Sequence, residues 1–225
     1  MTGAEATGFL YPFIEAEKRD ASDLVAALAR SAQAKMRDST ALRRATVASS
    51  AATLARLAGT MAARFATGGR LFAFGNGGSA TDAESAVALF RDPPWGRALP
   101  ALSLVEDRAV LTALANDVGF DLVFSRQLMA HARRGDMALG ISTSGDSTNV
   151  RVALAEGRRR GMLTIGLCGY GGGAMLDDPV IDVCLVVDSD SVHRIQETQD
   201  ALVLHLWAAL QHHLESGTAE PEETP

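Results

Sequence analysis

Apolar and polar positions change their period near residue 70 of the 225-residue chain. Before this point, apolar residues recur at helical spacing in two stretches, residues 9–34 and 40–66. The second stretch is followed by the pair Gly68-Gly69, which is typical of a helix C-terminus. After residue 70, short apolar runs alternate with amphipathic segments. The pattern therefore predicts two long helices followed by a domain of alternating strands and helices.

The alternating part contains five apolar runs that predict strands, at residues 71–74, 99–104, 137–141, 163–167 and 181–187. Helices are predicted at residues 79–90, 108–115, 120–132, 147–160 and 192–215. Nearly continuous apolar strands separated by helices indicate a parallel sheet covered on both faces. Ligands bind such sheets beyond the carboxyl ends of the strands, so the loops after the first and third strands become candidate sites.

Composition and charge narrow the class of protein. Hydrophobic residues make up 47% and charged residues 21% of the chain, as in an ordinary soluble domain. The net charge of −6 argues against binding to nucleic acid or to an anionic membrane, and no apolar run has the length of a membrane span. Cys168 and Cys184 lack CxxC spacing, and the N-terminus lacks a secretory signal pattern, so we expect reduced thiols in a cytoplasmic protein.

The first predicted strand runs into a glycine turn, Gly75-Asn76-Gly77-Gly78, and a helical pattern begins at Ser79. Glycines allow a close approach of the backbone to a ligand, and the N–H groups at a helix start suit a phosphate. Ser79 stands at the expected N-cap position, and its hydroxyl can instead contact a phosphate oxygen. Taken alone, the turn is equally typical of any strand-to-helix connection.

A second motif follows the third predicted strand, at residues 140–149, with the sequence Gly-Ile-Ser-Thr-Ser-Gly-Asp-Ser-Thr-Asn. Five of its residues carry hydroxyl groups: Ser142, Thr143, Ser144, Ser147 and Thr148. Serine at a helix start is often only a cap, but five hydroxyls exceed what capping requires. Hydroxyl and backbone donors at one turn favour a phosphate site.

At this point the chain resembles a known family. The two motifs occur in order with Ala115-Asn116-Asp117, Gly161-Met162 and Arg194-Ile195-Gln196-Glu197. Over roughly residues 40–214 this pattern is similar to the SIS (sugar isomerase) family, in particular its sedoheptulose 7-phosphate (phosphoheptose) isomerases. The resemblance implies a three-layer, flavodoxin-like fold with a five-stranded parallel sheet, sites between the subunits of a homotetramer, and a phosphorylated sugar as ligand. We divide the chain into an N-terminal extension and helix (1–38), a SIS domain (39–215) and a disordered tail (216–225).

The resemblance also implies which residues contact the ligand. Phosphate and sugar contacts fall on Asn76, Gly77, Ser79, Ser142, Thr143, Ser144 and Ser147, and the sugar pocket is lined by Asp107 and Gln196. Asp146 stands where the family usually has asparagine. Its carboxylate repels a phosphate unless the side chain turns away to cap the helix at Ser147.

Aldose–ketose isomerisation needs a base for a carbon-bound proton and an acid for an oxygen. By the resemblance, the family's helical histidine falls at Ser85, its glutamate base at Leu89 and its C-terminal histidine at Leu204. In many members these residues and a glutamine hold zinc. Only that glutamine, Gln196, is present, so we expect no metal-ligating residue and no cofactor, the zinc site being lost.

Nearby substitutes are poorly placed. Glu84 and His205 each lie one position from a vacated site, and one residue on a helix turns the side chain by about 100°. His193, which precedes Arg194, is the candidate acid or base, with Glu197 and Asp200 equally available.

Three functions stay open. The first is a phosphosugar-binding protein, such as a sensor, that lacks the usual metal and acid/base residues. The second is a divergent phosphoheptose isomerase that uses His193 or a neighbouring carboxylate. The third is a non-catalytic adaptor with a protein partner, similar to the SIS proteins that bind the bacterial replication initiator.

Overall fold

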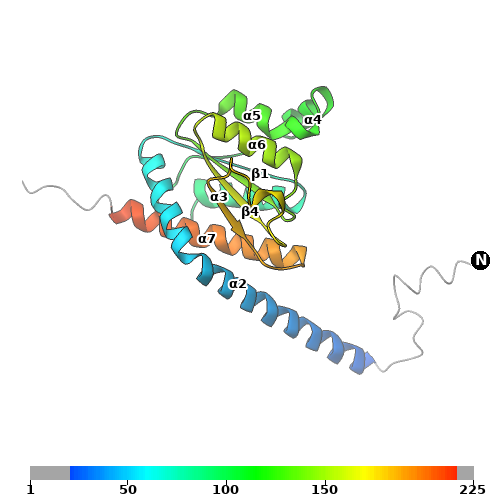
Figure 1. Ribbon diagram of the computed structural model, residues 1–225. Coiled ribbons are helices and arrows are strands. Elements are labelled where there is room, and N and C mark those ends of the chain that lie inside the picture. The colour runs from blue at the N-terminus through cyan, green and yellow to red at the C-terminus, as the bar shows by residue number, and fades with distance from the viewer. Residues whose placement is uncertain (1–20, 217–225) are drawn as a thin grey trace, which may run out of the picture. The chain divides into compact units, whose positions relative to one another are not determined.

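The computed structural model describes residues 21–216 (Figure 1). The chain divides into two compact units, residues 1–41 and 42–225. Helix α2, Ala21–Ala66, is one continuous helix, so the predicted break between residues 34 and 40 is wrong. Residues 35–39 contain neither glycine nor proline, and nothing in them ends a helix. The predictions for residues 9–20 and for the tail after Ser216 lie outside the described residues.

A parallel sheet of five strands forms the centre of the second unit. The strands are β1 (Leu71–Gly75), β2 (Ala101–Ser103), β3 (Met137–Ser142), β4 (Leu163–Cys168) and β5 (Val183–Val186). Their order, β2-β1-β3-β4-β5, is that of flavodoxin-like folds, which confirms the predicted fold class. Strands β1 and β3 are neighbours with Gly75 opposite Ile141, so the loops that follow them lie together at the carboxyl edge where the strand order reverses.

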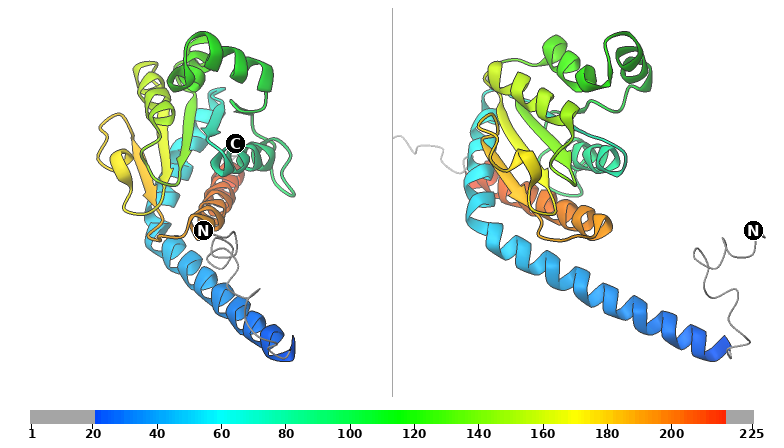
Figure 2. Two further views of the ribbon diagram at one scale, coloured as in Figure 1. Left: turned by 90° about the vertical axis from the view of Figure 1, so that its right-hand side faces the viewer. Right: turned by 45° about the vertical axis from the view of Figure 1, so that its right-hand side comes forward.

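The helices cover both faces of the sheet, as predicted (Figures 1 and 2). They are α3 (Gly78–Arg91), α4 (Arg108–Asp117), α5 (Val123–His131), α6 (Thr148–Arg159) and α7 (Val192–Ser216). Two short 3₁₀ helices, η1 (Phe120–Leu122) and η2 (Gly173–Met175), complete the described part. The helix predicted at residues 120–132 thus begins with a 3₁₀ turn, after Gly119 with its positive φ of 101°.

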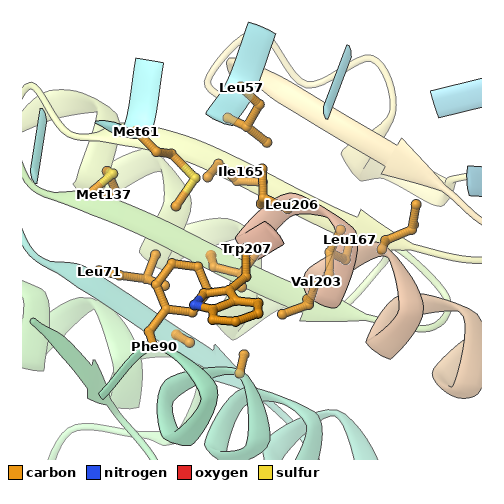
Figure 3. Packing of buried hydrophobic residues seen from close by; sticks show 14 of the residues in the cluster. Leu57, Met61, Leu71, Phe90, Met137, Ile165, Leu167, Val203, Leu206 and Trp207 are labelled. Carbon is orange, nitrogen blue, oxygen red and sulfur yellow. The ribbon is translucent and has the colours of Figure 1, made fainter. Parts of the chain in front are cut away.

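Alternating side chains of the strands build two hydrophobic cores. On one face, Leu71 and Ala73 pack with α3, α7 and the last turns of α2 around Trp207, which is 1% exposed (Figure 3). On the other face, Phe72 and Phe74 pack with α5 and α6. The period of two along β1 therefore places α3 and α7 together on one side of the sheet.

The structure also bears on the cysteines and on membrane-spanning helices. Cys168 and Cys184, on adjacent strands, are both free thiols, with their Sγ atoms 3.3 Å apart. Within the described residues, none of the helices combines the length and the apolar character that a membrane span requires.

Candidate functional site

The glycine turn after β1 leads directly into α3. Gly77 is the N-cap of the helix and has a positive φ of 56°, a conformation that glycine adopts without strain. The helix therefore begins at Gly78, and Ser79 is not the N-cap as predicted but a residue of the first turn, only 4% exposed. No side chain caps α3 at its N-cap Gly77, and the N–H groups of Ser79 and Ala80 donate to the carbonyl oxygens of Asn76 and Gly77, each at 3.0 Å.

The hydroxyl-rich loop after β3 leads into α6 in a similar way. Ser147 occupies the N-cap position, but its hydroxyl makes no capping bond to the helix. Instead, the hydroxyls of Ser142 and Ser147 are hydrogen-bonded to each other at 2.9 Å. Thr143 is half-buried and Ser144 exposed, beside this pair. The hydroxyls of this loop are therefore not used to cap α6.

A pair of amides joins the two loops. Asn76 Nδ2 donates to Asn149 Oδ1 at 2.8 Å, and Asn149 Nδ2 donates back to Asn76 Oδ1 at 2.9 Å. Asn149 is 2% exposed, so this reciprocal pair is shielded from water. Sequence reasoning singled out Asn76 but missed Asn149, although it ends the hydroxyl motif. We call the two joined loops, residues 75–79 and 142–149, the cradle.

Asp146 turns away from the α6 start, but it does not cap that helix. Its Oδ1 accepts the backbone N–H of Ala174 in η2 at 2.8 Å, which corrects the expected cap at Ser147. The neighbouring Gly145 has a φ of 73°, and a Cβ there would lie 2.0 Å from the carbonyl oxygen of Gly172. The loop after β4 thus packs closely against the cradle and determines where the Asp146 charge lies.

A pocket of about 320 Å³ lies beside the cradle, between α3 and α7. We call it the α3–α7 pocket; it is lined by Gly78, Thr81, Asp82, His193, Gln196, Glu197 and Asp200. Gln196 Nε2 donates to Asp82 Oδ2 at 3.0 Å. A Cβ at Gly78 would lie 2.2 Å from the same Nε2, so a side chain there would force this glutamine out of its present position. Gly78 belongs to both the cradle and the pocket, and places them side by side.

Three carboxylates, those of Asp82, Glu197 and Asp200, give the pocket an acidic character. Burial raises the pKa of Asp82, and the hydrogen bond from Gln196 opposes that rise. Burial and then the negative charge of Asp82 raise the pKa of Asp200. The two side chains therefore interact across the α3–α7 interface, next to the predicted candidates His193 and Glu197. Sequence reasoning missed Asp82, because nothing along the chain indicates that α3 faces α7 there.

The remaining residues considered in the sequence lie outside the cradle and are not among the residues that line the α3–α7 pocket. Asp107 is exposed and caps α4, with Oδ1 accepting the Val110 N–H at 3.0 Å. Ser85 is exposed, Leu89 packs against the core and Leu204 is 49% exposed. Within residues 21–216, no group of three or more His, Cys, Asp or Glu side chains is arranged to hold a metal ion.

Comparisons with known proteins agree with the resemblance. The family model "SIS domain" matches residues 36–169, more than half of the chain. A phosphoheptose isomerase from Pelobacter propionicus is 50% identical over 135 residues, which cover 59% of this chain and 70% of the relative.

Two solved structures extend the likeness beyond that region. Phosphoheptose isomerase GmhA from Neisseria gonorrhoeae superposes with a TM-score of 0.73 at 33% identity, over 84% of this chain and 99% of that chain. A phosphoheptose isomerase from Francisella tularensis gives 0.76 at 28% identity, over 81% and 97%. The chain therefore belongs to the SIS domain family, and phosphoheptose isomerases are among its homologues.

Proposed function

We propose that this chain binds a phosphorylated sugar, with the phosphate in the cradle. The observation that carries the proposal is that α3 and α6 both begin in the cradle without a side-chain cap. N–H groups in the first turn of a helix and the positive ends of two helix dipoles form an anion site. The Asn76–Asn149 pair holds these two helix starts together.

The hydroxyls of Ser142 and Ser147 supply further donors. They share one hydrogen bond at 2.9 Å, and both can rotate to donate to phosphate oxygens when a ligand is bound. Hydrogen bonds to a charged acceptor are stronger than those between neutral groups, so this exchange favours the bound state. The phosphoheptose isomerases among the relatives support a sugar phosphate as the ligand.

The sugar end of the ligand then lies toward the α3–α7 pocket, where Gln196 and His193 line the wall. We propose that the family's usual zinc and acid/base set is not used here. The resemblance carries those residues onto Ser85, Leu89 and Leu204, and a leucine offers neither a metal ligand nor a transferable proton. The donor set therefore does not fit a four-coordinate zinc ion.

We also propose the assembly that the resemblance implies, a cytoplasmic homotetramer. Leu204 on α7 is 49% exposed, and an apolar side chain at the surface of this helix suits contact with a second copy. Light scattering on the purified protein tests the proposal, since it distinguishes a tetramer from a monomer or dimer.

The binding proposal is tested by calorimetric titration with sedoheptulose 7-phosphate, and with the same sugar without phosphate. We expect saturable binding that requires the phosphate. Ser147→Ala should weaken it by about tenfold or more, the loss of one hydrogen bond to a charged group. The matched control is Ser49→Ala, which removes a hydroxyl that bonds only within α2, to Thr46 O. Absence of binding with pentose, hexose and heptose phosphates alike would refute the proposal.

A further inference from the structure

Cys168 and Cys184 are the two cysteines of the chain, and their sulfur atoms lie close together in the sheet. Cys168 ends β4, Cys184 lies in β5, and their Sγ atoms are 3.3 Å apart. Cys168 Sγ also lies 3.6 Å from the carbonyl oxygen of Leu185, so its side chain is directed to β5. A disulfide bond is about 2.05 Å long, so the two sulfur atoms need to approach by roughly 1.3 Å to form one.

The position of the pair distinguishes it from two cysteines that only fill a core. Cys168 is fully buried, but Cys184 is half-buried on β5, which is an edge strand of the sheet. A small reagent can therefore reach one of the two sulfur atoms from solvent, and the other lies within reach of the first. In the register of β3 and β4, Cys168 is opposite Ser142, with which the second loop of the cradle begins. The thiol pair thus lies next to the cradle.

We propose that Cys168 and Cys184 form a redox switch, in which a peroxide joins them in a disulfide that lowers the affinity of the cradle for a sugar phosphate. The inference rests on the proposed function, because the affinity that it regulates is that of the cradle. The disulfide itself can be measured without any ligand. In the cytoplasm proposed above, thiols are kept reduced, and a disulfide that forms there is usually transient and redox-sensing.

The environments of the two thiols assign the order in which they react. The hydrogen bond with Cys168 lowers the pKa of Cys184, whereas that hydrogen bond and burial raise the pKa of Cys168. The thiolate is the reactive form of cysteine, and Cys184 is also the residue that solvent reaches. Cys184 therefore attacks the peroxide, and Cys168 then attacks Cys184.

The two steps balance. The Cys184 thiolate attacks one oxygen of hydrogen peroxide and the O–O bond breaks, which leaves a sulfenic acid on Cys184. The hydroxide that departs takes up the proton lost from the Cys184 thiol and becomes water. The Cys168 sulfur then attacks the Cys184 sulfur, the S–S bond forms as the S–O bond breaks, and hydroxide leaves with the Cys168 proton as a second water. Both thiols are oxidised and the peroxide is reduced, and a dithiol reverses the change by exchange.

Backbone contacts at the end of β4 connect the pair to the cradle. Gly169, next to Cys168, donates its N–H to the carbonyl oxygen of Thr143 at 2.9 Å. Further along the same loop, the Met175 N–H donates to the carbonyl oxygen of Gly145 at 3.1 Å. Because β4 lies between β3 and β5, drawing Cys168 toward β5 pulls the end of β4 away from the cradle. Closure of the disulfide therefore weakens the hydrogen bonds that position the second loop of the cradle.

Two features allow the end of β4 to move. In the register of β4 and β5, Cys184 is opposite Gly166 rather than Cys168, so the bridge is diagonal and its closure shifts the strand ends. Tyr170, two residues after Cys168, has a φ of 51°, a conformation that costs a residue other than glycine free energy and persists only when its surroundings impose it. The loop therefore gains by relaxing once its contacts to the cradle weaken.

The test uses the full-length protein, first reduced and then treated with hydrogen peroxide. We expect the intact mass to fall by two hydrogens, without formation of a linked dimer. Calorimetry with sedoheptulose 7-phosphate should then show an affinity about fivefold or more below that of the reduced protein. Dithiothreitol should restore both the mass and the affinity. Dimedone present during the oxidation should label Cys184, and labelling of Cys168 instead would overturn the proposed order of attack.

The matched control is Cys184→Ala, which removes one partner of the pair outside the cradle. In reducing buffer, it should bind the sugar phosphate as the unmodified protein does, which also shows that it is folded. Peroxide should not change its affinity. An equal fall in this variant would overturn the switch, because oxidised methionines would then be the cause.

The outcomes separate this inference from the proposed function. Two free thiols after peroxide treatment, in a protein that binds the sugar phosphate when reduced, overturn the switch and leave phosphosugar binding intact. A disulfide that leaves the affinity unchanged also overturns it. If the reduced protein binds no pentose, hexose or heptose phosphate, the proposed function fails and the switch fails with it, whether or not the disulfide forms.

Discussion

The cradle and the α3–α7 pocket share Gly78, but they are built in different ways. The cradle consists of two contiguous stretches that follow β1 and β3, and its donors are backbone N–H groups and hydroxyls. The pocket is assembled from side chains of two helices, with Asp82 and Gln196 separated by 114 positions. The course of the backbone at a sheet edge determines the first, and helix packing determines the second. Substitutions can therefore alter the cradle and the pocket separately.

The largest effect is expected from a substitution that disrupts the cradle and leaves the pocket residues unchanged. Gly145→Ala places a Cβ 2.0 Å from the carbonyl oxygen of Gly172 in a residue with positive φ. We expect a loss of roughly 2–5 kcal/mol in the free energy of unfolding, together with loss of sugar phosphate binding. Urea denaturation measures it, with Gly171→Ala as the control, because no atom lies within 4 Å of a Cβ there. Equal stability of the two variants would contradict the close packing of this loop.

The next effect concerns the link between the two loops. Asn76→Ala and Asn149→Ala each break the reciprocal amide pair and leave the partner amide without its hydrogen bonds. We expect each to cost about 1–3 kcal/mol in stability and to weaken phosphate binding. Because both remove the same pair, the double variant should cost less than the sum of the two. Strictly additive losses in a denaturation cycle would show that the amides act independently.

A smaller effect is expected from a substitution that increases the affinity of the cradle for an anion. Asp146→Asn keeps an acceptor oxygen for the Ala174 N–H but removes a negative charge next to the hydroxyl loop. We expect affinity for a sugar phosphate to rise roughly two- to fivefold at low salt, with the gain falling as salt screens the charge. Calorimetry at two salt concentrations measures it, and an affinity that does not rise at low salt would place the Asp146 charge too far from the ligand to matter.

The smallest effect concerns the loss of folding stability that the charged carboxylates of the pocket cause. Because the pKa of Asp200 is raised above its ordinary 3.8, the folded state binds its proton more tightly than the unfolded state does. Its contribution to stability is complete below that value and is lost as the pH rises through the folded pKa. Asp200→Asn should therefore raise the Tm at pH 7, by less than about 4 °C, and the gain should vanish in acid.

Thermal unfolding at several pH values checks this, with Asp188→Asn, outside the pocket, as the control. Asp188 is exposed and lies on the segment that precedes α7. A Tm at pH 7 that falls in Asp200→Asn would mean that the carboxylate stabilises the fold, which contradicts its placement against Asp82.

The local pattern of apolar and polar residues was enough to predict much of the fold. The alternation of Leu71 and Ala73 with Phe72 and Phe74 predicts a strand buried on both faces, and the structure has β1 there. Local rules failed where two signals competed. Ser79 is a good N-cap residue, but Gly77 tolerates the positive φ that starts α3 two residues earlier. At residues 35–39 the expected interruption had no helix-breaking residue behind it, and α2 continues.

The sequence by itself determined the parallel sheet, the two loops at its switch point and the kind of donors they carry, because period, glycine and hydroxyl content are local properties. Only the tertiary structure decided that Asn149 pairs with Asn76, that Asp146 turns to η2, and that Asp82 and Asp200 face one pocket. Each of these depends on how segments distant along the chain pack against one another. Packing of α3 on α7 brings together side chains whose sequence separation of more than 100 residues carries no sign of contact.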